Sequence, residues 1–266
     1  MMMQFYRILY TFILSRRYRV KIEGVELLQK EGGKLILPNH QSHMDPQLIG
    51  VLFFKHTPIV PVVNESFFKI PFVSFFLKRW GAIPVAQFDK GNRDPNVLQN
   101  IFAGANAALD EGKSVIIYPS GQLQDLGIEK IKNKQAAHTV VSNLFDESDV
   151  RVLGVRVSGL WGSTFSKAWK GQQPPFLQRF LRGIGYFFAN LIFLSPKRNV
   201  VLEIVDITDE AKEQSKNDRR TFNIYLEEFY NVNGIEEVSY IRHFFWAPKT
   251  RRKLPQNIVD AYKKMS

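Results

Sequence analysis

The stretch LILPNHQSHMDPQLIG, residues 35–50, joins an apolar run to two histidines, a serine and an aspartate. The run that ends at Pro38 is typical of a buried strand, and the apolar periodicity from Pro46 onward indicates a helix. His40 and Asp45 are five residues apart, and five helical steps of about 100° overshoot a full turn by about 140°. The two side chains therefore meet only if the chain turns between a strand and a helix.

A histidine held by a carboxylate at such a turn is a candidate general base. Asp45 would fix the tautomer of His40 and stabilise its imidazolium form. Structural alternatives stay open for each residue. Asp45 before a proline is also a typical helix N-cap, and Ser42 is able to cap the helix or to hold the loop. His43 could join His40 as a metal ligand, although no third ligand stands nearby in the sequence.

The rest of the chain alternates between two patterns. Runs rich in Val, Ile and Leu predict strands at 34–38, 59–63, 114–118, 150–157 and 199–205. Helix-like stretches lie at 46–55, 66–79, 95–111, 134–145 and 176–194, with another near 219–230. This alternation predicts a single α/β domain with a mostly parallel central sheet flanked by helices. Ligands of such sheets bind beyond the carboxyl ends of the strands, which is where His40 falls.

The composition favours anionic partners. The chain of 266 residues has a formal net charge of +11, which directs it toward nucleic acid, anionic lipid or acidic protein. It has 22 phenylalanines, many of them in pairs, and these suit either a packed core or a membrane interface. It has no cysteine, which excludes disulfides, thiol nucleophiles and cysteine-based metal sites.

Two apolar runs, 5–14 and 183–194, are bordered by cations. Both are shorter than the about 20 apolar residues that a spanning helix needs. They predict helices lying in the headgroup layer of an anionic cytoplasmic leaflet, and buried core helices are the alternative. We therefore expect a peripheral or monotopic protein on the cytoplasmic face of the cell (inner) membrane. The first run has neither the basic start nor the small-residue cleavage site of a signal peptide.

Several stretches resemble one family. NHQSHMD resembles the H-x-x-x-x-D motif of the glycerolipid acyltransferase superfamily, whose best-known members acylate 1-acylglycerol-3-phosphate. RWGAIPV (79–85), VIIYPSGQL (115–123) and VLGVRVSGLWGSTFSK (152–167) are similar to the second, third and fourth blocks of that superfamily. The fourth block, LRGIGYFFANLIFLSPKR and RRTFNIYLEEFYN most resemble the acyltransferase part of bacterial 2-acylglycerophosphoethanolamine acyltransferase/acyl-acyl-carrier-protein synthetase proteins.

The sequence departs from the family pattern at two arginines. The second block usually ends in arginine, where this chain has Gln87, and the third is usually Glu-Gly-Thr-Arg, where it has residues 120–123, Ser-Gly-Gln-Leu. Both family arginines bind the acceptor phosphate, and arginine suits a phosphate monoester by bidentate bonding. A phosphodiester head group, as in lysophosphatidylethanolamine, needs less. The cations able to substitute are Lys90 and Arg93, or Lys130, Lys132 and Lys134, unless they form a solvated face.

The resemblance implies an acyltransferase that moves a fatty acyl chain from an acyl carrier protein or coenzyme A thioester to a glycerol hydroxyl of a lysophospholipid. This reaction would serve phospholipid synthesis or remodelling, with His40 as general base, Asp45 as its partner and no metal or cofactor. Backbone N–H groups near Gly121 are candidates for stabilising the oxyanion. The expected substrate-binding residues are Ser42, Gly81, Ile83, Ser120, Gly121, Gln122, Lys90 and Arg93.

Two other functions remain as alternatives. One is a 1-acylglycerol-3-phosphate acyltransferase that makes phosphatidate, and the other is a non-enzymatic basic membrane-surface protein. A nucleic-acid binder is not expected, because the cations border apolar runs instead of forming one face with interleaved aromatics.

The expected organisation has three parts. Residues 1–22 would form an N-terminal membrane-associating segment, and residues 23–205 an acyltransferase domain with the apolar interfacial helix near 176–194. Residues 206–266 would form a C-terminal helical extension.

Overall fold

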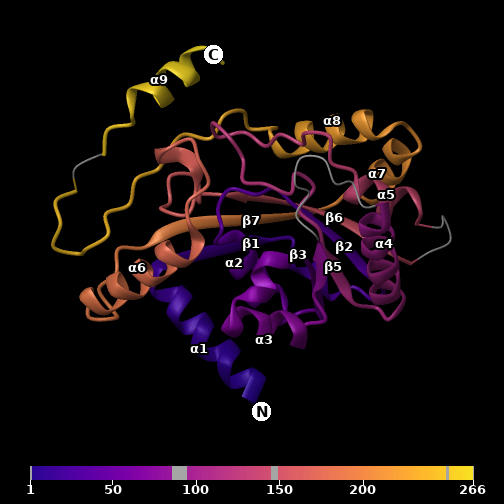
Figure 1. The fold of residues 1–266 in the computed structure, drawn as a ribbon, viewed down its shortest axis with the longest axis horizontal. Coiled ribbons are helices and arrows are strands. Elements are labelled where there is room, and N and C mark those ends of the chain that lie inside the picture. Colours follow the sequence, from indigo (N-terminus) through magenta and orange to yellow (C-terminus); the bar gives the residue numbers. More distant parts are fainter. Residues whose placement is uncertain (1, 86–94, 145–148, 250–251, 266) are drawn as a thin grey trace.

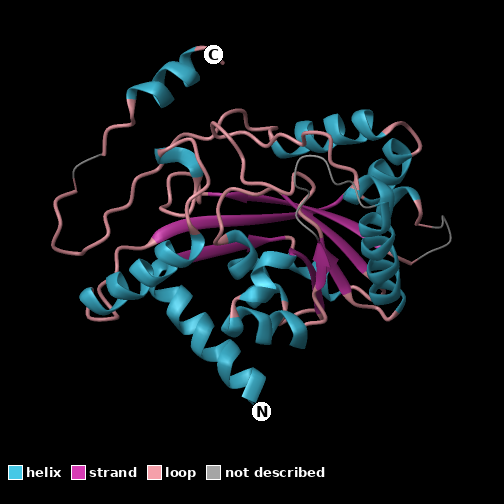
Figure 2. Cartoon of the chain, viewed as in Figure 1, coloured by secondary structure: helices cyan, strands magenta, loops and turns pink. Residues whose placement is uncertain are grey.

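The computed structural model describes residues 2–85, 95–144, 149–249 and 252–265. Within these ranges a seven-stranded sheet crosses the molecule, with helices on both sides of it (Figures 1 and 2). The strands are β1 (Tyr18–Glu23), β2 (Lys34–Pro38), β3 (Ile59–Asn64), β4 (Ile83–Val85), β5 (Ser114–Ile116), β6 (Arg151–Ser158) and β7 (Arg198–Asp206), in the order β1-β7-β6-β2-β5-β3-β4. Neighbouring strands are parallel except β6 and β7, which are antiparallel. The prediction of a mostly parallel α/β sheet is confirmed.

Two helical layers cover the sheet. The α-helices are α1 (Met2–Arg17), α2 (Asp45–Phe53), α3 (Pro71–Arg79), α4 (Pro95–Asp110), α5 (Ala136–Ser142), α6 (Phe176–Ala189), α7 (Thr208–Ser215), α8 (Arg219–Tyr230) and α9 (Gln256–Lys263). Short 3₁₀ turns are η1 (Val25–Gln29), η2 (Glu65–Lys69) and η3 (Lys167–Trp169). One face of the sheet packs against α4, α5, α7 and α8, and the other packs against α1, η1 and α2.

Strand β2 shows why the sheet needs both layers. Its side chains alternate, so that Leu35 and Leu37 enter the core beneath α4 and α8 while Ile36 enters the core beneath α2. Every residue of β2 is buried. A strand covered on both faces reads as a continuous apolar run, which is why LILP was recognisable in the sequence.

The N-terminal boundary expected at residue 22 falls inside a strand. Residues 18–23 form β1, which pairs with β7 along its whole length from Tyr18 opposite Arg198 to Glu23 opposite Glu203. Tyr18 is buried in the core together with Leu14 of α1. Part of the expected membrane-associating segment is therefore an edge strand of the sheet. Alternating burial along this strand, with few apolar residues, left little signal in the sequence.

The expected C-terminal extension is also part of the domain. Strand β7 runs past residue 205 to Asp206, and α8 then places Phe222 and Leu226 in the core with no exposed surface. The hydroxyl of Tyr230 donates a hydrogen bond to the Leu37 carbonyl at 2.8 Å, which ties the end of α8 to strand β2. The sequence predicted a separate extension because this region is polar, and only one stripe of each of its helices is apolar.

Several predicted elements end earlier than expected, and one is divided into two. The strand at 114–118 ends at Ile116, and the helix at 66–79 is divided into η2 and α3, with a proline beginning α3 at residue 71. The helix at 176–194 ends at residue 189. Asn190 is buried there and uses its side chain to bond the Tyr186 and His243 carbonyls and the Phe245 N–H, so the chain turns. Among the described residues, no helix has the length and apolar character to cross a membrane.

Candidate active site

The turn between β2 and α2 lies at the carboxyl ends of β2, β5 and β6. Asn39 begins the turn and fixes it to β6: its amide oxygen accepts the Val157 N–H at 2.6 Å, and its amide nitrogen donates to the Val157 carbonyl at 3.1 Å. Gln41 fixes the middle of the turn, because its side-chain oxygen accepts the N–H groups of Leu160 and Trp161 at 2.9 and 3.2 Å. Strand β6 and the segment after it therefore hold the residues on both sides of His40.

His40 and Asp45 meet as the sequence predicts. His40 Nδ1 lies 3.0 Å from Asp45 Oδ2, and both carboxylate oxygens of Asp45 also accept the Ser42 N–H, at 3.1 and 3.0 Å. The Asp45 side chain is fully buried, whereas 14% of the His40 side chain stays exposed. With Nδ1 held by the carboxylate, Nε2 is the nitrogen left to act as a base.

The N-cap interpretation of Asp45 is wrong. Helix α2 begins at Asp45 itself, and the carboxylate accepts its backbone hydrogen bond from Ser42, three residues before the helix. Pro46 does occupy the first turn of the helix, as expected. Ser42 holds the loop, because its hydroxyl accepts the Met44 N–H at 3.0 Å. Ser42 is fully buried, and its expected substrate contact stays a prediction.

His43 has a different environment from His40. Burial lowers the pKa of His43 to about 4, with a further contribution from the nearby His40, so the ring is neutral at physiological pH. Its backbone N–H donates to the Phe165 carbonyl, and its ring packs against Phe176 with 5.9 Å between centroids. No group of three or more His, Asp or Glu residues close enough to hold a metal ion occurs in the part of the chain that the structure describes.

The third block lies beside His40 but is already hydrogen-bonded internally. The Gly121 N–H donates to the Tyr118 carbonyl at 3.0 Å, so this particular N–H is already engaged, and the expectation that N–H groups near Gly121 stabilise the oxyanion stays a prediction. Ser120 is buried, and its hydroxyl donates to the Gln122 carbonyl at 2.8 Å. Gln122 is half-buried, and it therefore remains the member of this block with side-chain surface available. Gly121 has φ of 58°, a conformation that favours glycine.

The second block is partly buried in the core. Ile83 packs against Gly104 of α4, so packing accounts for this apolar residue. Gly81 is exposed, has φ of 65° and turns the chain between α3 and β4. Gln87, Lys90 and Arg93 lie outside the described residues.

Of the lysines expected to replace the family arginines, Lys134 is the best placed. Its Nζ lies 3.8 Å from the position that a Cβ on Gly121 would take, so the ammonium group borders the third block. Lys130 instead lies 3.7 Å from the Glu227 carboxylate, and Lys132 is exposed.

Three residues around His40 were not anticipated from the sequence. The ring of Tyr118 lies against the His40 ring with 4.4 Å between centroids. Glu129 is buried, and its Oε2 accepts the His40 N–H at 3.0 Å. Glu236, from the segment after α8, bonds the side chain of Gln41 and accepts the Gly159 N–H at 2.8 Å. The signal for Glu129 was its position as a lone acid among lysines; nothing in the sequence pointed to Glu236.

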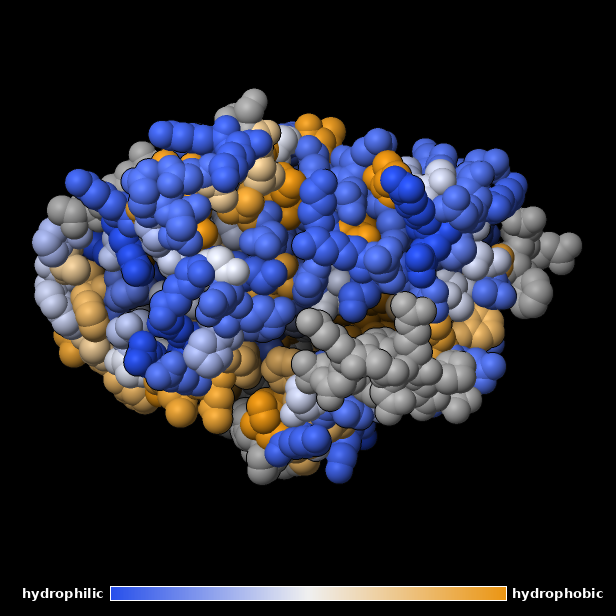
Figure 3. Space-filling view, turned by 45° about the horizontal axis from the view of Figure 1, so that its top comes forward, coloured by the Kyte–Doolittle hydropathy of each residue, from blue (hydrophilic) through white to orange (hydrophobic). Residues whose placement is uncertain are grey.

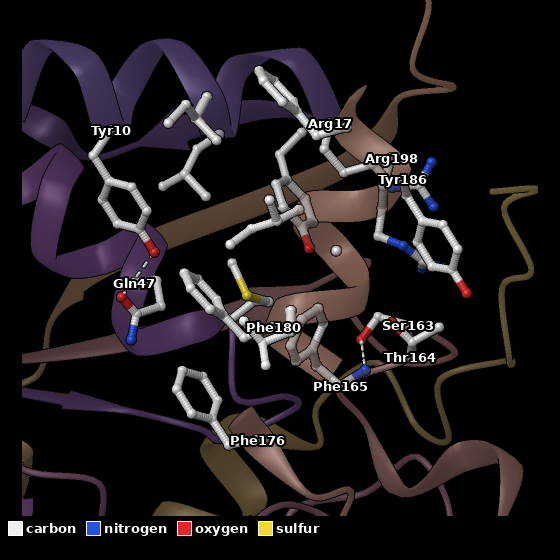
Figure 4. A pocket seen from close by; sticks show the side chains of 18 of the residues that line it. Tyr10, Arg17, Gln47, Ser163, Thr164, Phe165, Phe176, Phe180, Tyr186 and Arg198 are labelled. Atoms are coloured by element: carbon white, nitrogen blue, oxygen red, sulfur yellow. Dashed lines mark hydrogen bonds between the residues drawn. The ribbon is translucent and has the colours of Figure 1, made fainter. Parts of the chain in front are cut away.

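A large apolar cavity opens next to this turn. Its volume is about 710 Å³, and its walls come from α1, α2, α3 and α6 together with residues 162–165 (Figure 4). Met44, which immediately precedes Asp45, lines it, as does Phe176, whose ring touches His43. The cavity therefore begins within one or two residues of the His40–Asp45 pair. Its volume is within the range of about 300–1,000 Å³ that ligand pockets occupy.

Two arginines, Arg17 and Arg198, also line the cavity. Arg198 donates to the carbonyls of Gly159, Gly162 and Ser239, and Arg17 donates to the carbonyls of Pro196, Arg242 and Ile241 (these carbonyl partners are all backbone groups). Both guanidinium groups hold the C-terminal segment 239–242 against the sheet. Their guanidinium groups are used in hydrogen bonds to the backbone. The rest of the cavity wall consists mainly of apolar side chains (Figure 4).

Comparison with known proteins identifies the family. The family model described as Acyltransferase matches residues 19–157, which is more than half of the chain. The chain therefore belongs to this acyltransferase family, and the predicted membership of the glycerolipid acyltransferase superfamily is confirmed. The narrower resemblance to the 2-acylglycerophosphoethanolamine acyltransferase subgroup stays a prediction. No curated protein matches the chain.

Among the solved structures similar to this chain is that of the 1-acyl-sn-glycerophosphate (LPA) acyltransferase PlsC from Thermotoga maritima, which is 19% identical to it. The alignment covers 81% of this chain and 70% of that chain, with a TM-score of 0.49.

Replacing Asp45 tests the role of the carboxylate. In Asp45→Asn the amide oxygen still accepts the Ser42 N–H, and the cost of burying a charge disappears, so we expect a melting temperature close to that of the wild type. The amide nitrogen would donate to His40 Nδ1 and impose the tautomer in which Nε2 carries the proton. We expect the turnover rate to fall by about two orders of magnitude or more. Thermal melts and steady-state kinetics check this, and a variant that melts early but turns over normally would contradict it.

Proposed function

We propose that this protein transfers a fatty acyl chain from an acyl thioester to a glycerol hydroxyl of a lysophospholipid. The observation that carries the proposal is the His40–Asp45 pair, 3.0 Å apart, set beside an apolar cavity of about 710 Å³. Family membership supplies the reaction class. A non-enzymatic membrane-surface protein would have no use for a partly exposed histidine held by a fully buried carboxylate.

The chemistry follows from the free nitrogen of His40. Nε2 removes the proton of the acceptor hydroxyl while the hydroxyl oxygen attacks the thioester carbonyl carbon. Asp45 stabilises the imidazolium that forms. The carbonyl oxygen becomes an oxyanion. When it collapses, the C=O bond returns, the C–S bond breaks, and the thiolate takes the proton from Nε2. The products are an ester and a free thiol, and His40 returns to its initial state.

The cavity is the proposed site of the acyl chain. Aromatic and aliphatic side chains from four helices form its wall, and two of the wall residues, Met44 and Phe176, lie beside the catalytic turn. An acyl chain gains about 0.8 kcal/mol for each methylene removed from water. Placing the chain there brings the thioester carbonyl to the turn that carries His40.

The acceptor head group is the least constrained part of the proposal. Lys134 is a cation that borders the third block at Gly121. A single ammonium group suits the single negative charge of a phosphodiester better than the monoester of 1-acylglycerol-3-phosphate, for which arginines give bidentate bonding. We therefore place lysophosphatidylethanolamine-like acceptors ahead of 1-acylglycerol-3-phosphate.

The protein is proposed to work at a membrane surface. The ring of Phe12 in α1 lies 6.3 Å from the ring of Phe193, which belongs to the segment after α6. α1, α6 and this segment expose the apolar residues Ile8, Leu9, Phe12, Leu177, Leu181, Ile184, Phe188, Leu191, Phe193 and Leu194. Apolar surface gathers along one lower edge of the molecule, on the left, while the face above it is mainly hydrophilic (Figure 3). Flotation with anionic and neutral vesicles tests this attachment to the cytoplasmic leaflet, since binding should require the anionic lipid.

The direct test is an assay of the purified protein. Acyl-carrier-protein and coenzyme A donors are offered with a panel of lysophospholipids, and ester formation is followed by mass spectrometry. We expect transfer by the wild type and a loss of about 10²- to 10⁴-fold in His40→Ala. His43→Ala is the matched control and should be milder, because the neutral His43 lies outside the hydrogen-bonded pair. Equal activity of wild type and His40→Ala would overturn the proposal.

The acyl-chain assignment is tested by filling the cavity from α6. Gly183 lines the cavity, and a Cβ there would sit 3.9 Å from the Phe165 ring. Gly183→Leu should therefore shorten the accepted chain, reducing kcat/KM for the longest donors by about ten-fold or more while sparing short donors. Gly185→Leu is the control on the same helix, because Gly185 is exposed and a Cβ there meets nothing within 4 Å. Equal chain-length profiles for the two variants would place the acyl chain elsewhere.

A further inference from the structure

The peptide groups of His40 are held from both sides. Its carbonyl accepts the Gln124 N–H at 2.6 Å, and its own N–H donates to Glu129 Oε2 at 3.0 Å. The first partner is a backbone group, which most residue types could supply. The second is a buried carboxylate. Burying a carboxylate costs free energy that an apolar side chain at the same position would not cost.

Glu129 is itself fixed in place by the end of α8. Its backbone N–H donates to the Asn231 side-chain oxygen at 2.8 Å, and its carbonyl accepts the Asn231 side-chain nitrogen at 2.9 Å. A rigid connection therefore runs from the core helix through Asn231 and Glu129 to the backbone of His40. The carboxylate is only 1% exposed, and its second oxygen, Oε1, has no hydrogen-bond partner among the described residues.

We propose that Glu129 is a positioning residue, which holds the His40 peptide so that the imidazole keeps its place between Asp45 and the substrate hydroxyl. This inference rests on the proposed function of His40 as the base. Ser120 of the third block is buried next to Glu129, so this carboxylate lies between the third block and the His40 backbone.

The environment of Glu129 explains why its removal need not harm the fold. Burial raises the pKa of Glu129 to about 7, and the charge of Asp45 acts in the same direction, whereas His40 and the Ser120 hydroxyl oppose the rise. Tyr118 and Tyr230 also face it. The folded protein therefore binds the Glu129 proton more tightly than the unfolded chain does. As the pH rises from 4.5, the ordinary pKa of the carboxyl, toward 7, Glu129 progressively lowers the stability of the fold.

Two variants separate positioning from folding. Glu129→Met fills the same space without an acceptor, and it should melt at least as high as the wild type at pH 8, since it removes a buried acid. Its kcat should fall about ten- to a hundred-fold with KM within about two-fold, because the acceptor of a buried N–H is lost. Glu129→Gln keeps an acceptor oxygen and should retain kcat within about three-fold.

A measurement without substrate makes the test independent of the proposed function. Hydrogen exchange of the His40 amide, followed by NMR, should be slow in the wild type and in Glu129→Gln, and faster in Glu129→Met. If the wild type transfers acyl groups and Glu129→Met matches it in kcat and in His40 exchange, Glu129 does not position His40. If the wild type transfers none, the proposed function fails, while the exchange rates still decide whether Glu129 holds the His40 peptide.

Discussion

The hydrogen bond between His40 Nδ1 and Asp45 Oδ2, 3.0 Å long, is the interaction around which the rest of the molecule is arranged. It spans a turn whose two ends belong to different elements, the last residue of β2 and the first of α2. The turn can hold its shape because Asn39 bonds β6 and Gln41 bonds the segment after β6. Selecting the tautomer in this way leaves the second ring nitrogen of His40, Nε2, without a proton and able to act as a base.

The fold supplies that turn with both of the environments it needs. A fully buried carboxylate requires several hydrogen-bond donors, and Asp45 obtains them from His40 and from the Ser42 N–H. The acyl substrate requires the opposite, an apolar space large enough for a chain. α1 and α6 line that space and also expose apolar side chains on the surface of the protein.

The sequence was sufficient for the parts that depend on local patterns. The buried run at 34–38, the turn at 39–44 and the pairing of His40 with Asp45 were all predicted, because a strand covered on both faces and a motif of six residues are visible in isolation. The long-range parts were not. β1 pairs with a strand 180 residues away, and α8 has only a narrow apolar stripe, so both looked peripheral.

The same limit applies within the site. Nothing local indicates that Glu129 reaches His40, 89 residues away, or that Glu236 reaches Gln41, 195 residues away. Conversely, Ile83 and Gly121 were expected to serve the substrate, but the first is core and the N–H of the second is taken up by the Tyr118 carbonyl. A motif gives residue types in order, whereas hydrogen-bond partners depend on how the chain returns to the same place.

The central claim is that Asp45 fixes His40 in the tautomer whose Nε2 is free to accept a proton. The direct measurement is ¹⁵N NMR of histidine-labelled protein, in which the neutral His43 and the other histidines serve as internal references. The account predicts that neutral His40 carries its proton on Nδ1 and shows an unprotonated Nε2. A neutral His40 with its proton on Nε2 and an unprotonated Nδ1 would contradict the account, because a protonated Nε2 could not act as the base.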